Sequence, residues 1–293
     1  MDFDFIYRGE TKEIDDDVRA STSGSFIRLS NGFTHYELRG SDRGQFVVLV
    51  TGFSMPYFIF DPTFDFLVGS GFRVLRYDPF GRGFSDRPHL RYNMDLFVGQ
   101  LSELLNALNF KRINLLGISM GGAIAATFAV NFTECIGRLV LIDPVGSRPA
   151  PLPWIYRIGI LPGVSEIILG LAGPERMIRG LASNFFDPKH IERFREQYRT
   201  QTEFHGFQRA ILSTLRNRTV DGFPKVYQRL GKLDVPVLLI WGRNDQTLPL
   251  EQSRCILSTV PRAEFHVIED CGHIPHYEKP DEVNSILADF LNK

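Results

Sequence analysis

Apolar residues along the chain fall into short continuous runs that alternate with segments of helical periodicity. The runs are typical of strands buried on both faces of a sheet, and they span residues 45–50, 72–77, 113–116, 136–143 and 235–241. A shorter strand is expected at 264–268 and amphipathic helices at 94–108, after Asn93 as the N-cap, and at 280–291. This alternation predicts an α/β fold with right-handed crossovers and a mostly parallel central sheet that carries helices on both faces.

The first part of the chain has a different pattern. Residues 25–40 form two alternating segments around Asn31-Gly32, which predicts an antiparallel hairpin ahead of the parallel strands. Residues 1–24 are polar, and we expect either a poorly ordered lead or a strand added at the edge of the sheet. Acidic residues near the N-terminus and the lack of a long apolar stretch argue against a signal peptide.

The alternation stops after the run that ends at residue 143. Residues 146–230 contain no buried strand, but they contain helical patches, prolines, glycines and many aromatic residues. We therefore expect a helical cap, residues 146–230, inserted after the sixth strand of a core formed by residues 1–145 and 231–293. Four aromatic residues of the cap are expected to line a substrate pocket, namely Trp154, Phe185, Phe186 and Phe207.

One stretch of the predicted cap, residues 152–171, is apolar enough to suggest a membrane helix. Arg157, Glu166 and the break at Pro162-Gly163 argue against that, so two short helices without stable membrane insertion are expected there.

Composition narrows the class of partner. With 33 Lys and Arg against 34 Asp and Glu, the formal net charge is -1, which indicates no bulk attraction to nucleic acid or to an anionic membrane. A small-molecule partner is expected. The three cysteines, Cys135, Cys255 and Cys271, lack metal-ligand spacing, so we expect neither a disulfide framework nor a zinc site. We therefore expect a cytoplasmic setting. No pattern in the sequence indicates an oligomeric state.

The most distinctive motif is Gly117-x-Ser119-x-Gly121, which stands between an apolar run and a Gly/Ala-rich helical segment. A strand that turns at once into a helix brings the two elements so close that only glycine fits at the flanking positions. Ser119 would then lie at a strained corner, with a helix N-terminus beneath its hydroxyl. A serine nucleophile needs a base and a carboxylate that orients the base. His273 and Asp245 each follow a predicted strand, so all three residues are expected at the carboxyl edge of the sheet.

Four segments together resemble the α/β-hydrolase fold, in the serine-nucleophile, carboxylesterase- and lipase-like branch with a helical cap. They are T-G-F at 51–53, D-P-F-G-R-G-F-S at 78–85, G-I-S-M-G-G at 117–122, and G-R-N-D with C-G-H-I-P-H-Y-E-K-P near the C-terminus. The resemblance implies that Ser119 is the nucleophile, His273 the general base and acid, and Asp245 the orienting carboxylate. It also implies an oxyanion hole made by the backbone N–H groups of Phe53 and Met120.

The sequence departs from this family at Thr51, where histidine is frequent, so the resemblance leaves open how the oxyanion loop is held. Other residues compete for the catalytic roles. Asp143 also ends a strand and is an alternative carboxylate, and His276 is an alternative base. His266 and His35 lie in predicted strands, where structural histidines are expected. A turn that braces the site is expected around Asp78, Gly81, Gly83 and Ser85, and Cys271 is expected to serve packing.

These features favour hydrolysis of a carboxylic ester with an apolar acyl or aryl group, through an acyl-enzyme and without a cofactor or metal. An alternative is hydrolysis of a carbon–carbon bond in a meta-cleavage dienoic keto acid, which relatives achieve with the same triad. Such a site needs a cation for the substrate carboxylate, which cap residues Arg157, Arg179 or Arg193 could supply. One feature argues against this alternative: Ile118 precedes Ser119, whereas the nucleophile motif of those enzymes resembles N-S-M-G-G, with asparagine at that position. A third possibility is a receptor that binds a small molecule in the capped pocket without turnover.

Overall fold

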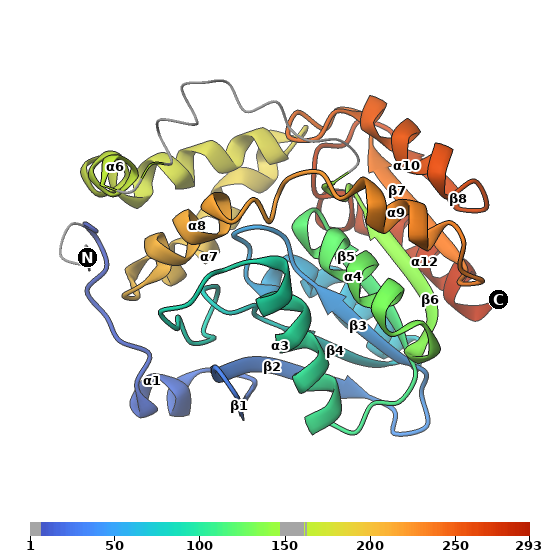
Figure 1. Cartoon of the computed structure of the whole chain (residues 1–293), viewed down its shortest axis with the longest axis horizontal. Coiled ribbons are helices and arrows are strands. Elements are labelled where there is room, and N and C mark those ends of the chain that lie inside the picture. The colour runs from blue at the N-terminus through green and yellow to red at the C-terminus, as the bar shows by residue number, and fades with distance from the viewer. Residues whose placement is uncertain (1–6, 147–160, 162) are drawn as a thin grey trace.

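The computed structural model describes residues 7–146, 161 and 163–293. Eight strands form one sheet in the order β1-β2-β4-β3-β5-β6-β7-β8 (Figure 1). β2 pairs antiparallel with β1 and β4, whereas the other neighbours are parallel. The mostly parallel sheet with an antiparallel start is therefore confirmed. The strands are β1 (Ser25–Leu29), β2 (Gly32–Gly40), β3 (Phe46–Val50), β4 (Arg73–Tyr77), β5 (Ile113–Ile118), β6 (Ile136–Ile142), β7 (Val237–Gly242) and β8 (Glu264–Ile268).

The hairpin between β1 and β2 turns one residue earlier than expected. Leu29 is paired with Gly32, so Ser30 and Asn31 form the two-residue turn. Gly32 has a φ of 144°, which glycine adopts more easily than other residues.

The expectation for residues 1–24 was wrong over its described part. Residues 7–24 add no strand to the edge of the sheet; they form a short helix, α1 (Asp16–Ser21), preceded by a stretch that contains a turn and one isolated bridge, between Lys12 and Phe204. In that stretch the N–H groups of Thr11 and Lys12 donate to the carbonyl of Glu203, and His205 donates back to Lys12. The partner of this segment lies in the insertion between β6 and β7, which sequence periodicity could not indicate.

The core has two layers, one on each face of the sheet. Val47 and Leu49 of β3 belong to one apolar cluster and Val48 and Val50 to the other, as the two-residue period of a strand requires. The core helices that contribute to the first cluster are α2 (Asp61–Gly69), α11 (Pro275–Glu278) and α12 (Pro280–Asn292), and helices of the insertion after β6 add side chains such as Ile178, Phe194 and Phe207. The second cluster contains residues of α3 (Met94–Ala107), α4 (Met120–Asn131), α9 (Pro224–Leu230) and α10 (Ser253–Thr259), together with Ala210 of the insertion. The side chain of Asn93 caps α3 as expected, by accepting the N–H of Leu96.

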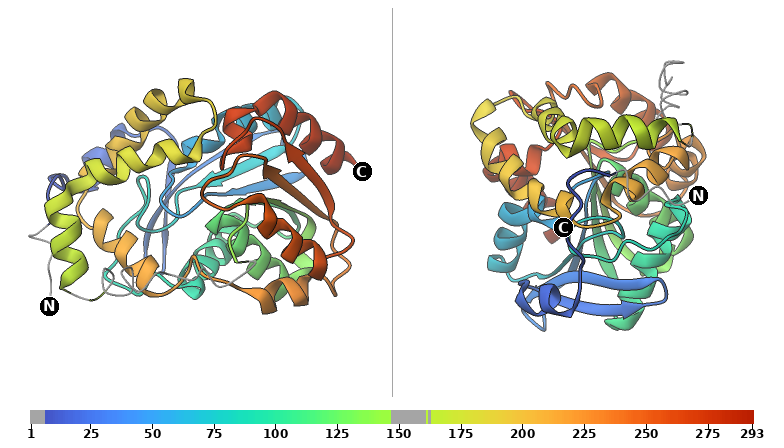
Figure 2. Two further views of the ribbon diagram at one scale, coloured as in Figure 1. Left: turned by 90° about the horizontal axis from the view of Figure 1, so that it is seen from above. Right: turned by 90° about the vertical axis from the view of Figure 1, so that its left-hand side faces the viewer.

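The insertion after β6, the sixth strand, is helical where it is described. It contains α6 (Val164–Gly180), α7 (Ile191–Arg199), α8 (Phe207–Arg216) and α9, with short 3-10 turns such as Leu181–Asn184. α9 packs against α4 of the core. α6 lies at the end of the molecule opposite the β1–β2 hairpin, as the right-hand view of Figure 2 shows. Within the described residues, no helix has both the length and the apolar character needed to cross a membrane.

Candidate active site

Ser119 lies at the corner between β5 and α4, with φ 54° and ψ -122°. Such a backbone conformation is rare outside glycine and costs on the order of 1–3 kcal/mol, which the surrounding structure must offset. A Cβ at Gly117 would stand 2.2 Å from the carbonyl oxygen of Gly121, and a Cβ at Gly121 would stand 2.2 Å from that of Val50. Both glycines are thus required by the close packing of strand and helix, as expected from the spacing of the motif.

His273 and Asp245 form an ordered pair near Ser119. His273 Nδ1 lies 2.7 Å from Asp245 Oδ2, and Asp245 Oδ1 accepts the N–H groups of Thr247 and Leu248 at 2.7 and 2.8 Å. These two backbone bonds fix the carboxylate, which in turn fixes the imidazole ring. Ser119 and His273 line the same cavity without a hydrogen bond between their side chains. In free enzymes such a contact is often long and tightens when substrate binds.

The rival residues take other roles. Asp143 is fully buried, and its Oδ1 accepts the N–H of Gly242 at 3.0 Å. Burial, and then the negative charge of Asp245, raise the pKa of Asp143 well above its ordinary value. Both effects favour the protonated form of Asp143 beside the pair. Donor atoms of Asp143, Asp245 and His273 lie within 4.8 Å of one another, but the bond between His273 and Asp245 already uses two of them.

The other histidines do not reach the cavity. His276 is fully buried, its ring lies 4.6 Å from that of Phe60, and neither ring nitrogen has a hydrogen-bond partner in the described chain. His35 Nδ1 lies 2.7 Å from Asp78 Oδ2, inside the turn expected to brace the site. His266 bonds its neighbour Glu264 at the surface.

The cavity above Ser119 has a volume of about 200 Å³. Its apolar lining side chains are Phe53, Met55, Ile59, Ile118, Leu181 and Ile274, and its polar ones, besides Ser119 and His273, are Ser54, Ser183, Asn184 and Thr247. Leu181, Ser183 and Asn184 belong to the insertion, so the insertion forms one wall.

Three of the four aromatic residues that the sequence suggested for this pocket are described, and they do not line it. Phe185 packs against Phe194 of the insertion, with ring centroids 5.0 Å apart. Phe207 is fully buried at the start of α8, and Phe186 is 49% exposed. Trp154 lies outside the described residues. Aromatic content identified the insertion, but the direction of each ring depends on packing between helices.

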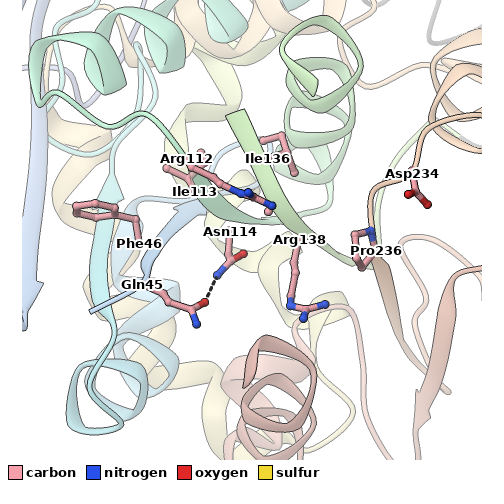
Figure 3. Close-up of a pocket in the computed structure, with 10 residues that line it drawn as sticks. Gln45, Phe46, Arg112, Ile113, Asn114, Ile136, Arg138, Asp234 and Pro236 are labelled. Atoms are coloured by element: carbon pink, nitrogen blue, oxygen red, sulfur yellow. Dashed lines mark hydrogen bonds between the residues drawn. The ribbon is translucent and has the colours of Figure 1, made fainter. Parts of the chain in front are cut away.

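A larger cavity of about 580 Å³ lies at the opposite edge of the sheet (Figure 3). Arg112, Asn114 and Arg138 line it, together with Gln45, whose side chain bonds Asn114 at 3.2 Å. These residues belong to the amino ends of the strands and their loops, and the cavity contains neither a serine nor a histidine. The smaller cavity, at the carboxyl edge, is therefore the candidate active site.

The loop after β3 carries one of the expected oxyanion donors. The N–H groups of Phe53 and Met120 donate to no acceptor within the described chain, and Met120 is the first residue of α4, where the helix dipole favours negative charge. The side chain of Thr51 does not hold this loop, because its buried hydroxyl has no hydrogen-bond partner in the described chain. The loop is instead held by Asp78, which accepts the N–H of Tyr57 at 2.7 Å, and by Arg82 and Gln201.

Glu278 holds the insertion against the loop that carries His273. One carboxylate oxygen accepts the N–H groups of Phe186 and Asp187 at 2.9 and 2.5 Å, and the other accepts that of Gly272 at 2.8 Å. Cys271 packs beside this carboxylate, and burial with the nearby negative charge raises the pKa of its thiol, which fits the expected packing role. Sequence analysis did not identify the structural role of Glu278, because the neighbouring residues H-Y-E-K-P do not indicate its distant hydrogen-bond partners.

Comparison with known proteins supports the hydrolase fold. The chain is 32% identical to a 2-hydroxymuconate semialdehyde hydrolase of Pseudomonas sp. (strain CF600), over 75% of this chain and 76% of the relative. It is 30% identical to a 2-hydroxy-6-oxo-6-phenylhexa-2,4-dienoate hydrolase of Comamonas testosteroni, over 77% of this chain and 79% of the relative.

Solved structures of hydrolases also match this chain along most of its length. A meta-cleavage product hydrolase from Pseudomonas fluorescens IP01 matches with a TM-score of 0.75 and 25% identity, over 92% of this chain and 97% of that one. An esterase from Exiguobacterium antarcticum has the same fold, with a TM-score of 0.78 and 21% identity over 92% of this chain and 100% of that one. The model of the alpha/beta hydrolase family matches residues 47–286. The chain therefore belongs to the alpha/beta hydrolase family, as the four sequence segments led us to expect, and it is a hydrolase.

Proposed function

We propose that the protein is a serine hydrolase that cleaves carboxylic esters with an apolar acyl or aryl group. The observation that carries this proposal is the cavity that contains Ser119 and His273. Most of the surface that faces this cavity is apolar, and its described lining includes no Lys, Arg, Asp or Glu. Such a lining favours a neutral, apolar group beside the nucleophile.

In the proposed reaction, Ser119 Oγ attacks the ester carbonyl while His273 Nε2 takes the serine proton. The bond between His273 Nδ1 and Asp245 keeps the imidazole in the tautomer that can accept this proton and stabilises its charged form. The oxyanion is bound by the N–H groups of Phe53 and Met120. The alcohol leaves with the proton from His273, and water then attacks the acyl-enzyme by the same route.

Residues 146–230 act as the cap in this proposal. Leu181, Ser183 and Asn184 close the cavity from the insertion, so the size of the acyl or aryl group depends on this segment. Within the described insertion, the segment that lines the cavity is the 3-10 turn Leu181–Asn184, between α6 and α7, whereas α9 packs against α4 of the core.

The names of the relatives favour a second candidate, hydrolysis of a carbon–carbon bond in a dienoic keto acid. That substrate carries a carboxylate, which needs a cation in the pocket to bind it. Arg179 and Arg193 are exposed and do not line the described cavity, and Arg157 lies outside the described residues. We therefore rank ester hydrolysis first.

The test is a panel of aryl esters of increasing acyl length, measured beside a meta-cleavage dienoate. We expect higher kcat/KM on the esters and no turnover by Ser119→Ala, which should fold normally because alanine removes only a hydroxyl. Higher kcat/KM on the dienoate would favour the second candidate. Full activity of Ser119→Ala would overturn both, and binding with thermal stabilisation but no turnover would indicate a receptor.

A further inference from the structure

Arg82 is a buried cation without a carboxylate partner in the described chain. It lies in the turn after β4 and is 0% exposed. Its guanidinium donates to three neutral oxygens, namely the carbonyls of Phe53 and Phe80, at 2.8 and 3.1 Å, and the hydroxyl of Thr214, at 2.7 Å. A buried charge that is neutralised by no acidic side chain is costly, which makes Arg82 a candidate for a role that a neutral residue would not fill.

The Nε bond fixes the peptide on the carboxyl side of Phe53. The next carbonyl, that of Ser54, is held at 2.8 Å by the side-chain amide of Gln201, which also accepts the N–H of Gly83 at 2.9 Å. Gln201 is 2% exposed. Two successive carbonyls of the oxyanion loop are thus tied to buried side chains, whereas the N–H of Phe53 has no acceptor in the described chain.

We propose that Arg82 is a positioning residue for the oxyanion hole. By holding the carbonyl of Phe53, it keeps the N–H of the same residue aimed at the site where negative charge develops, and Thr214 of α8 holds Arg82 in turn. The inference rests on the proposed function, because it assigns Phe53 as an oxyanion donor. It adds that the insertion sets the geometry of this donor through Thr214 and Gln201.

Arg82→Lys tests the proposal, because lysine keeps a positive charge but cannot form the three-way contact of the planar guanidinium. The matched control is Arg87→Lys. Arg87 is also buried, at 9% exposed, and donates to the carbonyls of Ser85, Gly83 and, at 3.5 Å, Gln201, but to no atom of the oxyanion loop itself. Both variants are expected to lose thermal stability.

Only Arg82→Lys is expected to lower kcat on an aryl ester, by roughly 10- to 100-fold with KM within about threefold of wild type. Binding of phenylboronic acid, which forms a tetrahedral anion on the serine, should weaken by a similar factor. Inhibition by the free carboxylic acid product should change little. Wild-type kcat and boronate affinity in a folded Arg82→Lys protein would overturn the proposal.

Thr214→Val keeps the test decisive if Arg82→Lys does not fold. It removes one acceptor of the guanidinium and is expected to lower kcat severalfold at unchanged KM. Unchanged kcat in this variant would overturn the proposal. Failure of the proposed function is distinguishable, because the wild type would then lack ester turnover or Ser119→Ala would retain it.

Discussion

Replacement of His276 by phenylalanine tests whether a neutral buried imidazole beside the candidate site lowers the stability of the folded protein at acid pH. His276 is fully buried three residues after His273, and no described residue bonds its ring nitrogens. Burial, and then the positive charge that His273 can carry, lower the pKa of His276 from 6.5 to about 3. The folded protein therefore keeps this ring neutral over a pH range in which the unfolded chain protonates it.

The sign and size of the effect follow from proton uptake. Between pH 6.5 and pH 3 the unfolded state binds more protons than the folded state, so the free energy of unfolding falls as the pH falls. At about pH 5 the protonation of this one ring favours the unfolded state by about 2 kcal/mol, whereas at about pH 8 the effect is close to zero. A side chain that does not titrate removes the whole contribution.

The assay is urea denaturation at pH 5, 6, 7 and 8, followed by tryptophan fluorescence, to which the fully buried Trp241 contributes. The free energy of unfolding of His276→Phe minus that of wild type should rise by about 2 kcal/mol from pH 8 to pH 5. Any loss of packing against Phe60 does not depend on pH and cancels in this difference. His276→Leu, with a different shape, should give the same rise. Parallel pH dependences in all three proteins would refute a neutral buried imidazole.

Three further predictions concern the carboxylates. Asp245→Asn should lower kcat by about 10³-fold or more, because the tautomer of His273 is lost, whereas Asp143→Asn should stay within about threefold; the reverse order in steady-state kinetics would make Asp143 the orienting group. Because the raised pKa of Asp143 lets the folded state keep a proton that the unfolded state releases, the free energy of unfolding of wild type should fall, relative to that of Asp143→Asn, as the pH rises. Urea titrations of both proteins at pH 5 and 8 measure this difference, and a difference that does not change with pH would contradict the raised pKa. Glu278→Gln should lower the free energy of unfolding by roughly 2–4 kcal/mol, because an amide cannot accept N–H groups at both ends, and an unchanged urea midpoint would contradict the contacts to Phe186 and Gly272.

The parts of the site that sequence could predict are those set by local constraints. Gly117 and Gly121 are required by clashes within a few residues of Ser119, so their spacing alone indicates the strand, the corner and the helix. Asp245 and His273 follow strands of a parallel sheet, whose carboxyl ends share one edge. The position of each residue along its strand was therefore enough to bring the three side chains together.

The lining of the cavity could not be predicted in the same way. Phe185 and Phe207 are aromatic residues of the insertion, but their rings fill gaps between helices, against Phe194 and Tyr198. Ring direction depends on how helices far apart in sequence pack. The same holds for the N-terminal stretch, where Glu10 accepts the N–H groups of Gly206 and Gln208 at the start of α8.

The insertion and the catalytic loops are joined by hydrogen bonds at more than one point. The side chain of Gln201 holds the carbonyl of Ser54, and the carbonyl of Asn184 accepts the N–H of His273 at 2.8 Å. Glu278 of the core holds the insertion at Phe186. A rigid displacement of the insertion would break bonds on both the oxyanion side and the histidine side of Ser119. Under the proposed function, we therefore expect substrate size and the geometry of the reacting groups to be coupled, so that a change in the insertion alters catalysis even where it leaves the cavity lining intact.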